Sequence, residues 1–309
     1  DLHPVAHSFP TRRSSDLVQK YLAATGDADG VRTRLFAAME RIIHGYADGG
    51  DGHVRLQADG LLWAGSASAQ ATWMDVELDG RAVTPRHGLA VEINALWYNA
   101  LSCYLELCER FGQTPLDGIE RVCEECRTNL PQTFWSESVG HLMDVVNDDG
   151  ADAAIRPNQL LAVALPHSAL SPARQAAVVD SVKHNLQTPY GLRSLSPGDP
   201  RYCPVYHGNP AKRDRAYHQG TVWPWWVAFF VEAVLRTADD REHERVRLQR
   251  QFEPLFTEHL EEGCLGSVSE IFNGNPPHTF KGCFCQAWSV AEVIRAWDLL
   301  KSGGPSCVC

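Results

Sequence analysis

The feature that most constrains the fold is a succession of apolar stripes at helical spacing, separated by long loops that hold most of the glycine, proline and tryptophan. In residues 31–46, for example, one helix face carries an apolar stripe made of Leu35, Met39, Ile42 and Ile43. Comparable patterns predict further helices over residues 18–24, 91–111, 116–130, 158–165, 172–185, 222–237, 241–261 and 286–300. Strand patterns are confined to short pieces near residues 54–56 and 142–146. The chain is therefore predicted to be all-α.

Helical hairpins that follow one another with long alternate connections are typical of a toroid of inner and outer helices. No repeat of constant length and no interdomain linker interrupts the pattern. We therefore expect one main folded region over residues 18–300, with residues 301–309 as a tail.

The first seventeen residues differ from the rest. Residues 8–17 (SFPTRRSSDL) match the translation of a common short-read library adapter, and residues 1–17 show no helical or strand period. The alternative is a disordered basic tail. We expect residues 1–17 to be non-native and to make no extended packing contacts, with the natural protein extending further upstream.

The charge balance disfavours two kinds of partner. With 38 acidic and 28 basic residues the formal charge is −10, which disfavours broad attraction to nucleic acid or to an anionic membrane surface. No apolar run is long enough to span a bilayer and no signal-peptide pattern is present, so a cytoplasmic protein is expected.

The ten cysteines are spread through the chain, and we interpret them as reduced thiols. Cys123 and Cys126 form a CxxC without a second pair at zinc-site spacing, and Cys283 and Cys285 are no better placed. Thiols packed as small apolar groups are favoured over a structural zinc site, and no metal site is predicted.

The segment over residues 60–100 has the residue types of a sugar site. Asp75 directly follows Trp73 and Met74 in a loop, and a helix then begins with Glu92 and continues with polar and aromatic residues that include Asn94 and Trp97. Aromatic rings cover the apolar faces of a pyranose while carboxylates and amides bind its hydroxyls. The alternative places both tryptophans in the core and Glu92 as an acidic residue favoured at a helix N-terminus.

Two later segments carry similar chemistry. His218 and Gln219 precede an aromatic helix start at Trp223, although His218 could also be a helix cap or a core histidine. Glu270 lies in a loop rich in glycine, proline and asparagine, and loops often position active-site carboxylates.

Glycoside hydrolysis needs one carboxyl to protonate the leaving oxygen and another to activate water or attack carbon. Asp75 and Glu270 are the natural pair. Four further acidic residues are interpreted as solvated loop charges, one of which, Asp214, is also a possible structural partner of the site: Asp79, Asp144, Asp148 and Asp214.

Seven motifs, in order, resemble the amylo-α-1,6-glucosidase domain of bacterial glycogen debranching enzymes. They are TWMD from Thr72, TPRHG from Thr84, VEINALWYNAL from Val91, RPNQ from Arg156, TPYGLRSLSP from Thr188, YHQGTVWPW from Tyr217 and SEIFNGNPPHTFKGCFCQAWSVAEV from Ser269. The resemblance implies an (α/α)6 six-hairpin toroid with Asp75 as general acid and Glu270 as general base, and without a cofactor. It also implies that seven residues face the sugar: Trp73, Glu92, Asn94, Trp97, His218, Gln219 and Trp223.

Two departures qualify this resemblance. Residues 66–71 (SASAQA) replace the glutamate- and glycine-containing approach to the acid that is usual in the family. The family's upstream portion, with its first helices, is absent, so residues 18–300 are expected to form a partial toroid that by itself can be inactive.

The resemblance therefore implies hydrolysis of α-1,6-linked glucose at branch points of glycogen or maltodextrin, by an inverting acid/base mechanism. Its expected partners are glycogen or branched α-glucan oligosaccharides, with neither nucleic acid nor membrane. Two alternatives stay open: a trehalase- or glucoamylase-like toroid glycosidase, and an inactive glycan-binding fragment.

Overall fold

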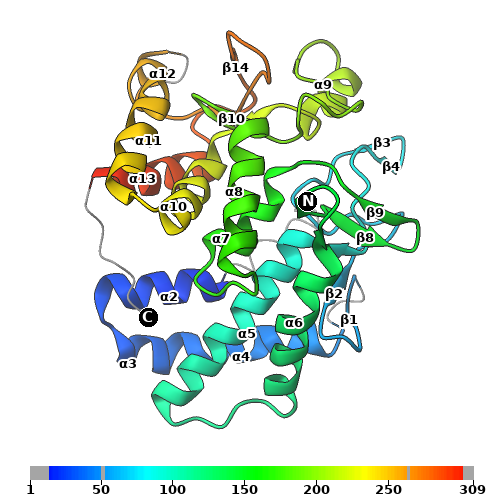
Figure 1. Ribbon diagram of the computed structural model, residues 1–309, viewed down its shortest axis with the longest axis vertical. Helices are drawn as coiled ribbons and strands as arrows, with labels where there is room; N and C mark the ends of the chain where they lie inside the picture. Colours follow the sequence, from blue (N-terminus) through cyan, green and yellow to red (C-terminus); the bar gives the residue numbers. More distant parts are fainter. Residues whose placement is uncertain (1–13, 50–52, 263–264, 302–309) are drawn as a thin grey trace. The chain divides into compact units, whose positions relative to one another are not determined.

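The computed structural model describes residues 14–49, 53–262 and 265–301 (Figure 1). The chain divides into two compact units. The first comprises Asp1–Asp75, Gly80–Ala153 and Leu161–Ser171, and the second comprises Val76–Asp79, Ala154–Leu160 and Pro172–Cys309. Long helices form the body of each unit, as the sequence predicts, and over the described ranges no strand exceeds three residues.

The first unit is organised around helix α5 (Val91–Phe111), which has the bounds predicted from its apolar pattern. The helix is buried on most sides, and it ends where Gly112 takes a left-handed conformation (φ 62°) that glycine adopts without strain. Figure 1 shows α6 running beside α5. Four helices pack against α5: α2 (Ser14–Thr25), α4 (Phe36–Ala47), α6 (Ile119–Phe134) and α7 (Leu161–Ala164).

Short antiparallel strands fasten the loops of the first unit. Strand β1 (Val54–Leu56) pairs with β2 (Leu62–Ala64), which confirms the first predicted strand. The second predicted strand is divided between two pairings, because Met143 and Asp144 separate its two halves. The elements involved are β5 (Leu89–Ala90), β6 (Trp135–Ser136), β7 (His141–Leu142), β8 (Val145–Asn147) and β9 (Gly150–Asp152). The unit also holds α3 (Ala28–Gly30), a π-helical turn η2 (Val31–Leu35) and β4 (Arg81–Ala82).

Helix α2 begins at Ser14, so the predicted boundary at residue 18 falls inside a helix. Leu17 is 53% exposed, whereas Asp16 is buried and pairs with Lys20 at 3.3 Å. Residues 1–13 of the expected non-native segment, and residues 302–309 of the expected tail, lie outside the described residues. The proposed domain boundaries therefore stay predictions.

The second unit has helix α10 (Val227–Thr237) at its centre, with eight of its eleven residues buried. Trp225 stacks on Trp288 at 3.9 Å between ring centroids, which joins the start of α10 to the last helix. The main elements that pack against α10 are α8 (Pro172–Leu186), α11 (Arg241–Phe256), α13 (Ala287–Lys301) and the 3-10 turn η4 (Pro224–Trp226). Shorter elements complete the unit: β3 (Glu77–Leu78), η3 (Pro157–Leu160), α9 (Pro210–Tyr217) and α12 (Glu258–Glu261).

A five-stranded antiparallel sheet in the second unit was not predicted. Its order is β10-β11-β12-β13-β14, with Leu192 opposite Trp223, Val222 opposite Phe272 and Phe272 opposite Phe280. Strands of two or three residues are too short to show an alternating pattern, which explains the omission. The strands are β10 (Gln187–Thr188), β11 (Gly191–Arg193), β12 (Val222–Trp223), β13 (Ile271–Phe272) and β14 (Phe280–Lys281).

Two helix boundaries were wrong for identifiable reasons. The helix predicted from residue 222 begins later, because Trp223 precedes Pro224 and is therefore extended (φ −118°, ψ 114°). The helix predicted over residues 241–261 breaks at Thr257, which leaves the helical region (φ −127°, ψ −81°).

Candidate active site

Glu270 is held at both carboxylate oxygens immediately before strand β13. The phenol of Tyr217 donates a hydrogen bond to Oε1, and the backbone N–H of Cys283 donates to Oε2 at 2.9 Å. The backbone N–H of Glu270 in turn donates to the carbonyl of Cys283 at 2.8 Å. The carboxylate is therefore fixed by the end of α9 and by the loop after β14, which are far apart in sequence.

This carboxylate lines a cavity of about 650 Å³ in the second unit. That volume lies within the range of roughly 300–1,000 Å³ usual for small-molecule sites. The lining combines aromatic rings, cations and small residues: Tyr206, His207, Gly208, Arg213, Ser269, Glu270, Phe280, Lys281, Gly282, Cys283 and Phe284.

An aromatic cluster surrounds the Tyr217 side of the carboxylate. The Tyr217 ring lies 5.6 Å from that of Tyr206, 4.8 Å from that of His218 and 4.9 Å from that of Trp223. The indole N–H of Trp223 donates to the Tyr217 carbonyl at 3.2 Å, which ties β12 to the end of α9. Burial raises the pKa of Tyr206, with Arg213 opposing the rise and Glu270 and Asp214 adding to it. The cluster presents both ring faces and phenol groups next to Glu270.

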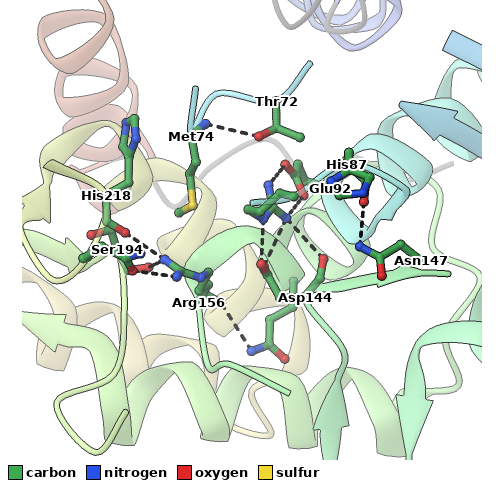
Figure 2. A network of polar contacts seen from close by, with 12 residues as sticks. Thr72, Met74, His87, Glu92, Asp144, Asn147, Arg156, Ser194 and His218 are labelled. Atoms are coloured by element: carbon green, nitrogen blue, oxygen red, sulfur yellow. Dashed lines mark hydrogen bonds and ion pairs between the residues drawn. The ribbon is translucent and has the colours of Figure 1, made fainter. Parts of the chain in front are cut away.

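His218 and Gln219 are buried, at 1% and 6% exposure, and belong to a network around Arg156. The Arg156 guanidinium donates to the carbonyls of His218 (2.8 Å) and Ser194 (3.0 Å), as drawn in Figure 2. It also donates to Oε1 of Gln219 at 2.8 Å. The His218 ring stacks on Trp223 with 5.5 Å between centroids. These contacts hold the backbone that follows α9.

A buried histidine anchors the residue before Glu270. Nε2 of His259, which is 1% exposed, accepts a hydrogen bond from the backbone N–H of Ser269 at 3.1 Å. The imidazole must be neutral at Nε2 to accept this bond. Burial lowers the pKa of His259, although Glu262 opposes that effect, so the neutral form is favoured.

Asp75 closes the first segment of the first unit and is exposed. The residues before it are buried: Trp73 is 7% exposed, Met74 is fully buried, and the Met74 N–H donates to the Thr72 hydroxyl at 3.3 Å (Figure 2). The buried residues Trp73 and Met74 therefore fix the chain directly before Asp75, whose side chain is exposed to solvent.

Glu92 belongs to a buried ion triad in the first unit. Arg86 donates to both Glu92 oxygens at 2.5 and 2.6 Å, and to Oδ2 of Asp144 at 2.6 Å. The two acids are labelled in Figure 2. Burial acts to lower the pKa of Arg86, but the carboxylates of Asp144 and Glu92 outweigh it and raise that pKa. The interpretation of Asp144 as a solvated loop charge was wrong: it is 2% exposed, because it compensates the buried guanidinium.

Asn94 and Trp97 are buried and lie on the same helix as Glu92. The Asn94 amide accepts from the N–H of Leu62 (2.7 Å) and donates to the carbonyls of Leu62 and Ala90. The Trp97 indole donates to the Gly60 carbonyl at 3.1 Å. Both side chains therefore fasten the chain around β2 to α5, and a sugar contact by either one stays a prediction.

Several residues around Glu270 were not selected from the sequence. Tyr217 begins the YHQGTVWPW motif, and its place directly before His218 was a usable signal. Helix α9 was not predicted, although the sequence holds a helix-start signal there: Asn209 caps the helix through its side chain, and Pro210 occupies its first turn. The contact from the backbone N–H of Cys283 to Glu270 could not be predicted from the sequence, because it does not depend on a side chain. Within the described ranges no three histidine, cysteine, aspartate or glutamate side chains form a possible metal site, and no helix is suited to crossing a membrane.

The fold is shared with known carbohydrate-active enzymes. Neutral trehalase from Saccharomyces cerevisiae matches with a TM-score of 0.53 at 13% identity, over 70% of this chain and 38% of that one. The GH78 family rhamnosidase of Bacillus sp. GL1 matches with a TM-score of 0.53 at 15% identity, over 89% of this chain and 24% of that one. The predicted fold type, that of the (α/α)6-toroid glycoside hydrolases, is thereby confirmed.

Sequence comparison defines the family within that class. The amylo-alpha-1,6-glucosidase profile matches residues 15–295, so the chain belongs to that family of glycoside hydrolases. The glycogen debranching enzyme of Saccharomyces cerevisiae is 24% identical over 216 residues, which cover 56% of this chain. The match spans 14% of that relative's length.

Proposed function

We propose that the chain hydrolyses α-1,6-linked glucose at branch points of glycogen or maltodextrin, with inversion at the anomeric carbon. The observation that carries the proposal is the Glu270 carboxylate, anchored by Tyr217 and Cys283 in the lining of a cavity of about 650 Å³. A positioned carboxylate beside a sugar-sized cavity is what activation of water requires. The cytosolic location predicted from the sequence accompanies this function as a prediction.

The two carboxyl groups take different roles in this mechanism. Asp75 protonates the glycosidic oxygen as it leaves, and Glu270 removes a proton from the water that attacks the opposite face of the sugar. The groups are expected to lie roughly 6.5–9.5 Å apart, the separation that leaves room for water in inverting enzymes. Neither role calls for a metal or an organic cofactor.

The remaining predicted residues divide by their contacts. Trp223 and His218 lie in the aromatic cluster around Tyr217, which favours a place near the sugar ring. Gln219, Glu92, Asn94 and Trp97 make buried contacts within the protein, which favour a positioning role. Trp73, directly before the proposed acid, stays a predicted sugar contact.

The substrate assignment is tested by comparing three glucans: a maltodextrin bearing a single α-1,6-linked glucose, a linear malto-oligosaccharide, and trehalose. We expect free glucose from the branched substrate alone. Release from trehalose or from the linear chain would transfer the assignment to a trehalase- or glucoamylase-like activity. Sugar binding by calorimetry without release of glucose would support the glycan-binding fragment.

A further inference from the structure

The cavity beside Glu270 carries an excess of positive charge. Its lining holds two cations, Arg213 on α9 and Lys281 on β14, and the imidazole of His207, against the single carboxylate of Glu270. The whole chain has a formal charge of −10. The net charge of the residues that line this cavity is therefore positive, whereas the net charge of the whole chain is negative.

Neither cation forms an ion pair with a carboxylate of the described residues, although Asp214 lies close enough to Tyr206 to raise its pKa. Over the described ranges, neither Arg213 nor Lys281 has a carboxylate at salt-bridge distance. Other arginines of the same unit do have one, such as Arg201 with Asp199 at 2.8 Å and Arg295 with Glu232 at 2.7 Å. The two cavity cations thus retain their charge for a ligand.

Arg213 is held by an aromatic ring. Its guanidinium carbon lies 5.9 Å from the ring centroid of Tyr206, and its Nε is buried without a hydrogen-bond partner among the described residues. A guanidinium positioned over a ring keeps its planar donors available for a carboxylate or phosphate, which it can bind in a bidentate manner. Lys281 adds a second, flexible point charge to the same lining.

We propose that this cavity takes a sugar bearing an anionic group, with that group bound by Arg213 and Lys281 and the sugar ring beside Glu270. A neutral glucan also accepts hydrogen bonds from cations, but it leaves the charge of both uncompensated. An anion compensates them, and the attraction between the opposite charges is expected to weaken as salt is added. The inference rests on the proposed function, because that function assigns Glu270 to sugar chemistry.

The test is calorimetric binding of four probes to the full chain at low and high ionic strength: D-glucose, D-glucose 6-phosphate, D-glucuronate and inorganic phosphate. At low salt we expect the anionic sugars to bind roughly tenfold more tightly than glucose, equivalent to about 1.4 kcal/mol. The advantage should shrink at high salt, because exposed charges are screened over about a Debye length. The phosphate and carboxylate arms show which anion the cavity prefers.

Matched variants localise the effect. Lys281→Met and Arg213→Gln should each remove most of the anion advantage while leaving glucose affinity within about twofold. Arg215→Gln is the control, because Arg215 is an exposed cation on the same helix that does not line the cavity. It should change neither affinity, and circular dichroism checks that each variant is folded.

The outcomes separate this inference from the proposed function. Equal affinity for glucose and the anionic sugars would overturn the inference and leave the proposed function standing. An anion advantage that survives in the Lys281→Met, Arg213→Gln double variant would also overturn it, as would inorganic phosphate binding as tightly as glucose 6-phosphate. Failure of every sugar to bind would count against both.

Discussion

At the scale of single residues, the Tyr217 phenol is the side chain that orients Glu270. Tyr217→Phe removes one hydrogen bond to a carboxylate and keeps the ring in its cluster. Hydrogen bonds to charged groups contribute about 1.5–3 kcal/mol, so kcat for glucose release should fall roughly tenfold or more, with KM little changed. Tyr202→Phe is the control, because its phenol donates to Asn275 at 2.9 Å outside the cavity lining. Equal kinetics for the two variants would refute the positioning role.

Gly282 is the second residue that determines where Glu270 lies. Its φ is +72°, and a Cβ there would stand 3.0 Å from Cβ of Glu270 and 3.0 Å from Cγ1 of Ile271. Gly266 has nearly the same backbone angle (φ +78°), but no atom of the described residues lies within 4 Å of such a Cβ. Both Gly→Ala variants should therefore lower the melting temperature, and only Gly282→Ala should also lower kcat. An equal loss of activity in both would show that backbone strain alone is responsible.

His259 predicts a pH dependence of stability. Its pKa in the folded protein is lowered by burial, so below the ordinary value of about 6.5 the unfolded state binds more protons. The stabilisation by neutral His259 is therefore present above that value, and it is lost as the pH falls from about 6.5 toward the folded pKa. Denaturant unfolding across this range should show stability rising with pH, with a smaller slope in His259→Gln. An NMR titration that places the imidazole pKa above about 6.5 would contradict this.

At the scale of elements, the Arg86 triad joins the start of α5 to the loop before β8. Glu92→Gln leaves part of a buried charge uncompensated and should lower the free energy of unfolding by about 3–5 kcal/mol, measured with denaturant. Arg121→Gln is the matched control, since its pair with Glu125 at 2.8 Å is exposed and such pairs contribute little. Equal effects of the two substitutions would mean that the triad does not hold this part of the fold.

The sequence predicted the elements whose apolar residues repeat over several helical turns. Helix α5 has the predicted bounds because 21 residues of apolar pattern specify it, whereas the strands of the second unit are too short to show any period. Asp75 and Glu270 are proposed as the catalytic pair because each lies in an uncommon motif, and that assignment stays a prediction. The pairing of Arg86 with Asp144 was missed because 58 positions separate them, and only the fold brings them together.

At the scale of the whole molecule, the family match over residues 15–295 includes both proposed catalytic carboxyls, Asp75 in the first compact unit and Glu270 in the second. The match spans 14% of the length of the yeast relative, so the activity proposed here belongs to a limited part of such an enzyme.

The stereochemistry of the first product tests the central proposal most directly. When the chain cleaves a branched maltodextrin bearing one α-1,6-linked glucose, proton NMR in the first minutes should show β-glucose, because water activated by Glu270 attacks the face opposite the leaving oxygen. Glu270→Ala should release no glucose, and added azide should restore turnover with formation of the β-glucosyl azide. Formation of α-glucose first, or near-normal release by Glu270→Ala, would contradict the assignment of Glu270 as the base of an inverting glucosidase.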